Sequence, residues 1–438
     1  MVPTNRAMDG PRPARPGMLL AVAALAAAAG GCGTAEVPVL FLLGGDDAGP
    51  AMPDAALPSL GTKAEYCAGS GPPLLVDAFA DGGTVSTCPD QLVQRAFPYA
   101  LCTCGEFVSE HGLVTDAFDG SQGAYDPSTA MAAGSVGVNG ELHPGPMQIG
   151  GSLWASSAMS ITTTSTVQVS GDLNAEGEMF PGGTLDVGGD AGMANGIQSM
   201  SDVTIGGTLD VPTGAPFDVS GTPTFGARVS TPFQVAPACA CEPSELVDVA
   251  GVVATYEAHN DDEALGVNRT SLENVQAAVT MTLPCGRIYF TSIAANQVPI
   301  QLTATGRVAI FVGGDISTTS DFQIEVAPGA EVDLFVAGTV TVGGSFQVGD
   351  TTYPARARTY VGGPTVNLLG GPTDNPQSAA TLAGNLYAPN ATLDLGGSAT
   401  TTLYGSIFAS SVIASADLSI HYDDTILTQS FAPACAAP

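Results

Sequence analysis

Short apolar strands alternate with polar corners along most of this chain. In the recurring motif an apolar residue is followed by two glycines or a glycine with a small neighbour, then a small polar residue and a second apolar residue, as in residues 149–153 (IGGSL), 169–173 (VSGDL), 187–191 (VGGDA) and 205–209 (IGGTL). The glycines at 151, 171, 189 and 207 recur at intervals of 20, 18 and 18 residues, which is typical of one three-sided coil of a parallel β-solenoid. Stretches between the motifs, such as 166–169 (TVQV), alternate polar and apolar residues as half-buried strands do. The pattern therefore predicts an all-β fold, a parallel β-helix.

A second block of the same motif follows residue 285. Its glycines at 314, 338, 362, 384 and 405 lie at intervals of 24, 24, 22 and 21 residues, so its coils are longer than those of the first block. Between the blocks, residues 244–259 carry apolar side chains at helical spacing behind Ser244 as N-cap. We expect one α-helix there, packed along the flank of the solenoid.

The N-terminus has the composition of a targeting segment. Arg6, Arg12 and Arg15 precede an apolar run of 12 residues from Met18 to Ala29, which is too short to span a bilayer. The segment ends in Ala-Gly-Gly-Cys32 and resembles a bacterial lipobox, which implies lipidation of Cys32 and, with glycine at position 33, sorting to the outer membrane. An ordinary secretory signal is the alternative.

Cysteine usage agrees with export. Besides Cys32 there are eight cysteines, an even number that suits disulfides in an oxidising compartment. The hypothesis is that two of them pair with Cys102 and Cys104, and two with Cys239 and Cys241; the full set of candidates is Cys67, Cys88, Cys102, Cys104, Cys239, Cys241, Cys285 and Cys435. In this hypothesis Cys67 and Cys88 are the partners of 102 and 104, and Cys285 and Cys435 are the partners of 239 and 241. Zinc is disfavoured by the Cys-x-Cys spacing.

The sequence patterns divide the chain into seven segments. The predicted organisation is a lipoprotein signal peptide at 1–31, a flexible tether at 32–62, a disulfide-stapled N-terminal cap at 63–128, a first solenoid block at 129–236, a cysteine-flanked helical insertion at 237–285, a second solenoid block at 286–425 and a C-terminal tail at 426–438. A cap is expected because the first coil of a solenoid would otherwise expose apolar side chains and unpaired backbone.

Charge excludes one class of partner. The chain has 42 acidic and 11 basic residues, for a net charge of −31. A surface that follows phosphates needs basic side chains to replace counterions. We therefore expect no nucleic-acid partner.

The C-terminal motifs carry a family resemblance. Residues 384–390 (GNLYAPN), 403–409 (LYGSIFA) and 420–423 (IHYD) resemble a domain of uncharacterised bacterial surface proteins, including pilus-associated proteins and myxobacteria-like lipoproteins. The resemblance implies an envelope location and a β-helix, and it brings no catalytic residues. More distantly, the coils are similar to the polymer-forming bactofilins and to ice-binding β-helices.

An enzyme acting on polysaccharides would need carboxylates or a basic residue grouped on one face. The candidates are Asp315, Asp333, Arg307, Arg356 and Arg358. Asp315 occupies the same motif position as Asp172 and Asp190, which favours hydrogen bonding at a corner. Arg356 and Arg358 are predicted to share a strand face, where a surface ion pair or a cap explains them better than catalysis does.

Two further clusters contain side chains that could bind a ligand or react. The run 260–263 (NDDE) offers oxygen ligands for calcium, although solvated loops after helices carry such runs more often. His421 lies beside Tyr422 and Asp423, where a C-terminal capping network is favoured over catalysis. We expect no cofactor and no catalytic residue. We interpret the protein as a non-enzymatic outer-membrane lipoprotein that is held to the membrane by its lipid anchor. Its role would be that of a scaffold, or of an adhesin for a glycan or envelope component. The alternatives are a polysaccharide lyase or hydrolase, and an ice-binding-like or polymer-forming protein.

Overall fold

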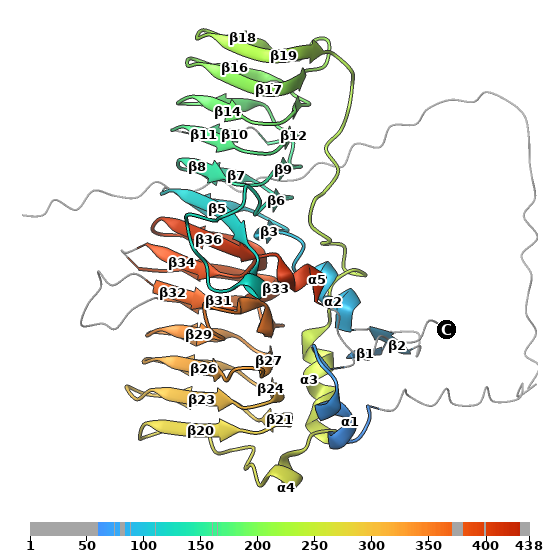
Figure 1. Ribbon diagram of the computed structural model, residues 1–438, viewed down its shortest axis with the longest axis vertical. Helices are drawn as coiled ribbons and strands as arrows, with labels where there is room; N and C mark the ends of the chain where they lie inside the picture. Colours follow the sequence, from blue (N-terminus) through green and yellow to red (C-terminus); the bar gives the residue numbers. More distant parts are fainter. Residues whose placement is uncertain are drawn as a thin grey trace, which may run out of the picture. The chain divides into compact units, whose positions relative to one another are not determined.

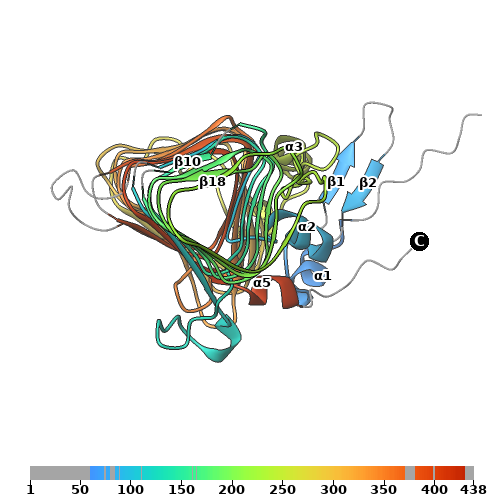
Figure 2. The same cartoon turned by 90° about the horizontal axis from the view of Figure 1, so that it is seen from above.

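The computed structural model describes residues 60–429 except 74, 79–83, 88, 110, 160, 164, 370–379 and 398–399. In this part of the chain the strands form a parallel β-solenoid, which confirms the predicted fold class (Figure 1). Each coil places one strand on each of three faces, and the stack is three-sided when seen along its axis (Figure 2). The predicted signal peptide and nearly all of the predicted tether lie outside the described residues.

The first face is formed by strands that follow one another along the stack. In stack order they are β20 (Val279–Leu283), β23 (Ile300–Ala304), β26 (Phe322–Val326), β29 (Phe346–Val348), β32 (Ala380–Ala383), β34 (Thr401–Tyr404), β36 (Leu418–Asp423), β5 (Leu113–Phe118), β8 (Met147–Ile149), β11 (Val167–Val169), β14 (Leu185–Val187) and the first halves of β17 (Val203–Asp210) and β19 (Pro223–Val229).

The second and third faces have the same order. The second face contains β21 (Gly286–Phe290), β24 (Arg307–Val312), β27 (Glu331–Val336), β30 (Ala357–Val361), the first halves of β33 (Asn385–Leu395) and β35 (Ile407–Ala414), then β3 (Leu101–Thr103), β6 (Val136–Val138), β9 (Leu153–Ala155), β12 (Leu173–Ala175), β15 (Ala191–Met193) and the ends of β17 and β19. The third face contains β22 (Ile293–Ala295), β25 (Ile316–Thr318), β28 (Val340–Val342), β31 (Thr365–Leu368), the ends of β33 and β35, then β4 (Phe107–Ser109), β7 (Leu142–Pro144), β10 (Ile161–Thr163), β13 (Met179–Pro181), β16 (Ile197–Ser199) and β18 (Phe217–Val219).

The two predicted blocks form one stack whose order differs from the order of the chain. The last strand of the second block, β36, pairs with β5 of the first block and places His421 opposite Asp116. Strand β35 likewise pairs with β3 and β4. The stack therefore runs from β20 to β36 and continues from β5 to β19, after which the chain returns along the outside (Figure 1). Residues 101–118, which we expected in a terminal cap, instead form a coil in the middle of the stack.

The alternation in the sequence sets which side chains fill the interior. In most three-residue strands the outer two residues are buried and the middle one points outward, as in Val167-Gln168-Val169. Inward residues of successive coils are in register, so Val167, Leu185 and Val203 stack on one another. One coil cannot cover its own apolar residues, and the stack supplies the cover.

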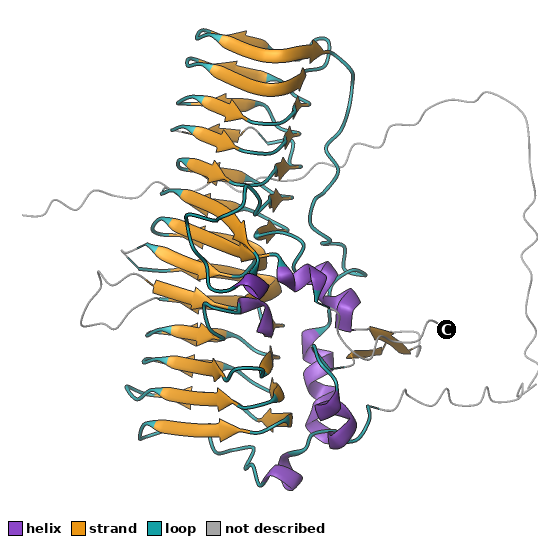
Figure 3. Ribbon diagram, viewed as in Figure 1, coloured by secondary structure: helices purple, strands orange, loops and turns teal. Residues whose placement is uncertain are grey.

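Helices cover the second face only over the longer coils (Figure 3). They are α1 (Lys63–Ala68), α2 (Pro89–Ala96), α3 (Val249–Ala258), α4 (Asp262–Leu265) and α5 (Thr425–Thr428), beside a hairpin of β1 (Leu75–Ala78) and β2 (Thr84–Thr87). The predicted helix is α3, which is shorter than expected because Asp248, not Ser244, caps its first turn. It contacts β21, β24 and β27, which confirms the prediction that this helix packs along the flank of the solenoid. Among the described residues, no helix is long and apolar enough to cross a membrane.

An aromatic column joins α3 to the covered face. Phe311, Phe335 and Tyr360 are in register on successive strands, with ring centroids 5.2 and 4.5 Å apart. Tyr256 of α3 stacks on Phe311 at 4.1 Å. These outward positions are apolar because the helix shields them from water, which explains why the strands of this face read as continuous apolar runs.

The disulfide pairing predicted from the sequence is wrong. The structure joins Cys67 to Cys285, Cys102 to Cys239 and Cys104 to Cys241; Cys88 and Cys435 lie outside the described residues. The two Cys-x-Cys segments pair with each other because the returning chain lies directly on β3 and β6. Gly137 of β6 leaves room for this contact, since a Cβ there would meet the Cβ of Ala238 at 2.8 Å.

Candidate functional site

The aspartates of the repeat motif belong to the corners. Asp172 Oδ1 accepts a hydrogen bond from the backbone N–H of Asp190 in the next coil at 2.9 Å, and Asp190 Oδ1 accepts one from Thr208 N–H at 2.6 Å. Asp315 makes the same bond to Thr339 N–H at 2.7 Å. The corner interpretation is confirmed, and these carboxylates tie successive coils together.

Asp333 and Arg358 form an ion pair inside the molecule, so the expected surface location of Arg358 is wrong. Both side chains have 0% exposure, and the guanidinium binds both carboxylate oxygens at 2.6 and 2.9 Å. Glu331 accepts a further bond from Arg358 at 2.9 Å. Burial raises the pKa of the Asp333 carboxyl, and the neighbouring guanidinium opposes that shift. Neither group can reach a substrate from this position.

The expectation that Arg356 and Arg358 share a strand face is wrong. Arg356 ends a 3-10 turn, Pro354–Arg356, and β30 begins only at Ala357. The Arg356 guanidinium therefore turns outward and stacks over the ring of Tyr353 at 4.5 Å.

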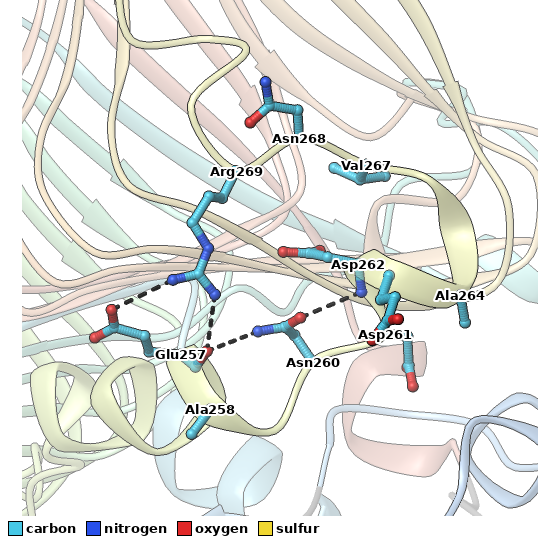
Figure 4. A pocket seen from close by; sticks show the side chains of 10 residues that line it. Glu257, Ala258, Asn260, Asp261, Asp262, Ala264, Val267, Asn268 and Arg269 are labelled. Carbon is cyan, nitrogen blue, oxygen red and sulfur yellow. Dashed lines mark hydrogen bonds and ion pairs between the residues drawn. The ribbon is translucent and has the colours of Figure 1, made fainter.

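The acidic run 260–263 lies where α3 meets α4, at an open pocket of about 920 Å³ (Figure 4). Asp261 is not available to a ligand, because it binds Arg287 through both carboxylate oxygens at 3.0 and 3.1 Å. Asp262 Oδ1 accepts from Tyr289 N–H at 3.0 Å, and burial raises the pKa of its carboxyl. Within the described ranges, no three His, Cys, Asp or Glu side chains are grouped as a metal ion would require.

His421 belongs to a cluster that the sequence did not indicate. Its Nδ1 lies 2.7 Å from Asp116 Oδ1, and Tyr125 donates its hydroxyl to Asp116 Oδ2 at 2.6 Å. The Tyr125 ring stacks on the imidazole at 3.8 Å, and the Tyr404 ring lies at 5.1 Å. The bond to Asp116 assigns the proton to Nδ1 and leaves Nε2 as an acceptor when the ring is neutral. Burial, reinforced by Asp116, raises the pKa of Tyr125.

Tyr422 and Asp423, the sequence neighbours of His421, do not belong to this cluster and make other contacts. Asp423 has 0% exposure and accepts hydrogen bonds from the backbone N–H groups of Gly120 at 2.9 Å and Ala355 at 3.2 Å. Tyr422 donates its hydroxyl to the carbonyl of Phe97 at 2.8 Å. These two residues join β36 to its surroundings, but β36 lies between β34 and β5 in the stack, so the prediction of a C-terminal capping network is wrong.

A groove of about 480 Å³ lies on the first face across the joint between the two blocks. It is lined by Ser419, Val114, Gln148 and Gln168, which occupy one outward column in register on β36, β5, β8 and β11. Ser419 and Val114 are two residues along their strands from His421 and Asp116, so the groove and the cluster lie next to each other. Ser419 and Val114 carry shorter side chains than the two glutamines of the adjoining coils.

Sequence reasoning missed this groove because its two sides come from opposite ends of the repeats. Ser419 and Val114 meet across the joint, and, like His421 and Asp116 of the neighbouring cluster, they are 305 residues apart, so no spacing rule connects them. The available signal was the pair of glutamines at the same motif position in 147–149 (MQI) and 167–169 (VQV).

Comparison with protein-family models found a similarity over part of the chain. Residues 242–428 match a family model described as a domain of unknown function (DUF7305). The matched stretch contains α3, α4, all strands from β20 to β36 and α5. No curated protein and no solved structure matches the chain. The second block with α3, α4 and α5 is therefore similar to that family, and it ends at the coil on which the first block stacks.

Proposed function

We propose that the protein is a non-enzymatic lipoprotein of the outer membrane or cell surface, whose β-helix acts as a rigid scaffold or adhesin. The observation that carries the proposal is the one-sided attachment of the N-terminal segment. Cys67 is bonded to Cys285, immediately before β21 in the coil at one end of the stack. A tether that begins at a lipidated Cys32 would reach the solenoid there and leave the remaining coils free to project.

Arginines strengthen this attachment. Arg307 donates to the backbone carbonyls of Tyr66, Gly71 and Pro72 at 2.7 to 2.8 Å. Arg287 donates to the carbonyl of Leu60 at 2.8 Å. Charge-assisted bonds to several carbonyls resist displacement more than neutral bonds do. The segment 60–72 is thus fastened to the first coils by one covalent and several polar contacts.

The far end of the stack favours a single scaffold over a polymer. In β19, Pro223 has no N–H for a further strand. Arg228 occupies an inward register position opposite Leu209, with its guanidinium 4.1 Å above the ring of Phe217. An inward charge and a proline are devices that prevent edge-to-edge pairing. These residues support a terminal coil that ends the stack.

Fractionation with surface proteolysis tests the proposal. The full-length protein is expected in the outer membrane, labelled by palmitate, and cleaved by protease added to intact cells. Cys32→Ala is expected to lose the label and the membrane association. A protein that is protected in intact cells, or one that turns over polysaccharides catalytically, would contradict the proposal.

A further inference from the structure

We propose that the groove across the joint of the two blocks binds a neutral glycan chain. The inference rests on the proposed adhesin function and assigns it a site. The groove lies on the first face, which no described helix covers, and its volume of about 480 Å³ falls in the range of small-molecule sites.

The charge of the groove selects a neutral ligand. Its lining contains no lysine or arginine, in a chain whose net charge is −31. Its one carboxylate, Asp417, already accepts the backbone N–H of Gly112 through Oδ1 at 2.7 Å. An acidic glycan or a nucleic acid would find no counter-charge here and would be repelled by the protein as a whole.

The polar groups suit hydroxyl partners. Gln148 and Gln168 are exposed and offer amide donors and acceptors, while Ser419, Thr166 and Thr400 offer hydroxyls. Adjacent coils repeat these groups at about 4.8 Å, the spacing of parallel strands. A ligand with hydroxyls along an extended chain can bond to several coils at once.

The remaining lining is apolar, which suits the C–H surfaces of sugar rings. Pro146 is exposed and Val114 is half-buried, so these two residues supply the apolar surface of the groove, while Leu113 and Met147 are buried in the core beneath it. Tyr404 and Tyr125 stand beside it with their rings against His421. Alternating polar and apolar surface in a shallow groove fits a carbohydrate better than an extended peptide, whose backbone would need a free strand edge.

The test measures binding of the full-length oxidised protein to oligosaccharides by saturation-transfer NMR and calorimetry. The probes are neutral tetra- to hexasaccharides of glucose, galactose, mannose and xylose, with uronate-containing oligomers as the acidic comparison. At least one neutral probe is expected to bind, with little dependence on salt. Val114→Arg fills the groove and is expected to weaken binding by about tenfold or more, and Gln148→Ala by about fivefold.

Thr204→Arg is the matched control, because Thr204 is an exposed outward residue of the same face and column, on β17. It is expected to bind like the wild type. Binding of only acidic probes, binding that Val114→Arg leaves unchanged, or no binding by any neutral probe would overturn the groove assignment. Surface proteolysis reports on the adhesin proposal independently, so a surface-exposed protein whose groove binds nothing would refute the groove alone.

Discussion

Removing Arg358 should destabilise the protein strongly because it leaves a carboxylate buried without its partner. Asp333 and Arg358 both have 0% exposure, and the guanidinium makes bonds at 2.6 and 2.9 Å to Asp333 and at 2.9 Å to Glu331. Breaking one side of such a pair costs about 3–5 kcal/mol. Arg358→Met keeps most of the side-chain volume, so we expect a loss near the middle of that range, about 4 kcal/mol.

The measurement is guanidinium chloride unfolding followed by circular dichroism on oxidised protein. Arg269→Met is the control, because Arg269 and Glu257 form an ion pair with 42% and 54% exposure, and such pairs contribute about 0–1 kcal/mol. The double variant Arg358→Met/Asp333→Leu removes both charges and is expected to be more stable than Arg358→Met alone.

The loss in Arg358→Met should also depend on pH. Burial raises the pKa of Asp333, and removing the guanidinium raises it further. A carboxyl with a raised folded-state pKa favours the folded state fully below its unfolded pKa, and this contribution is lost as pH rises through the folded-state pKa. The variant should therefore be closest to wild type in acid. A loss under 1 kcal/mol at pH 7, or a double variant less stable than the single one, would refute the reasoning.

Three other predictions concern single side chains. Asp262→Asn should raise the melting temperature at pH 7 and give no gain near pH 3. Burial raises the folded-state pKa of Asp262, so the stability that the protonated carboxyl contributes to the wild type is lost as pH rises through that pKa. An equal gain at both pH values in calorimetry would contradict this. Gly207→Ala should cost about 1–3 kcal/mol in denaturant unfolding, since its Cβ would clash with Asp190 Oδ1, and an unchanged midpoint would disprove the close corner contact. Asp423→Ala should cost about 3 kcal/mol or more by unpairing the N–H groups of Gly120 and Ala355, whereas Asp423→Asn should retain part of that stability.

The fold class could be predicted because its determinants are local. Alternation in a segment such as Val167-Gln168-Val169 sets which side chain points inward, and the motif aspartates mark corners wherever they occur. Both features repeat within one coil. The alternation and the corner aspartates can therefore be recognised without knowledge of any distant residue.

The order of the coils could not be predicted from the same pattern. Every coil presents similar strand edges, so nothing in the motif states that β36 stacks on β5. The pairing of Cys102 with Cys239 and of Cys104 with Cys241 depends on where the returning chain lies. The groove was missed for the same reason, since Val114 and Ser419 meet only after the blocks have stacked.

The central claim is that the two blocks form one stack joined at β36 and β5, and engineered cross-linking tests it most directly. Val114 and Ser419 are opposite each other across the joint, where neighbouring strands about 4.8 Å apart suit a disulfide. Val114→Cys/Ser419→Cys is expected to form that bond under mild oxidation, and Val114→Cys/Thr204→Cys, with its two positions several coils apart, is expected not to. Failure of the first pair to cross-link in folded protein, or equal cross-linking of both pairs, would contradict the single stack.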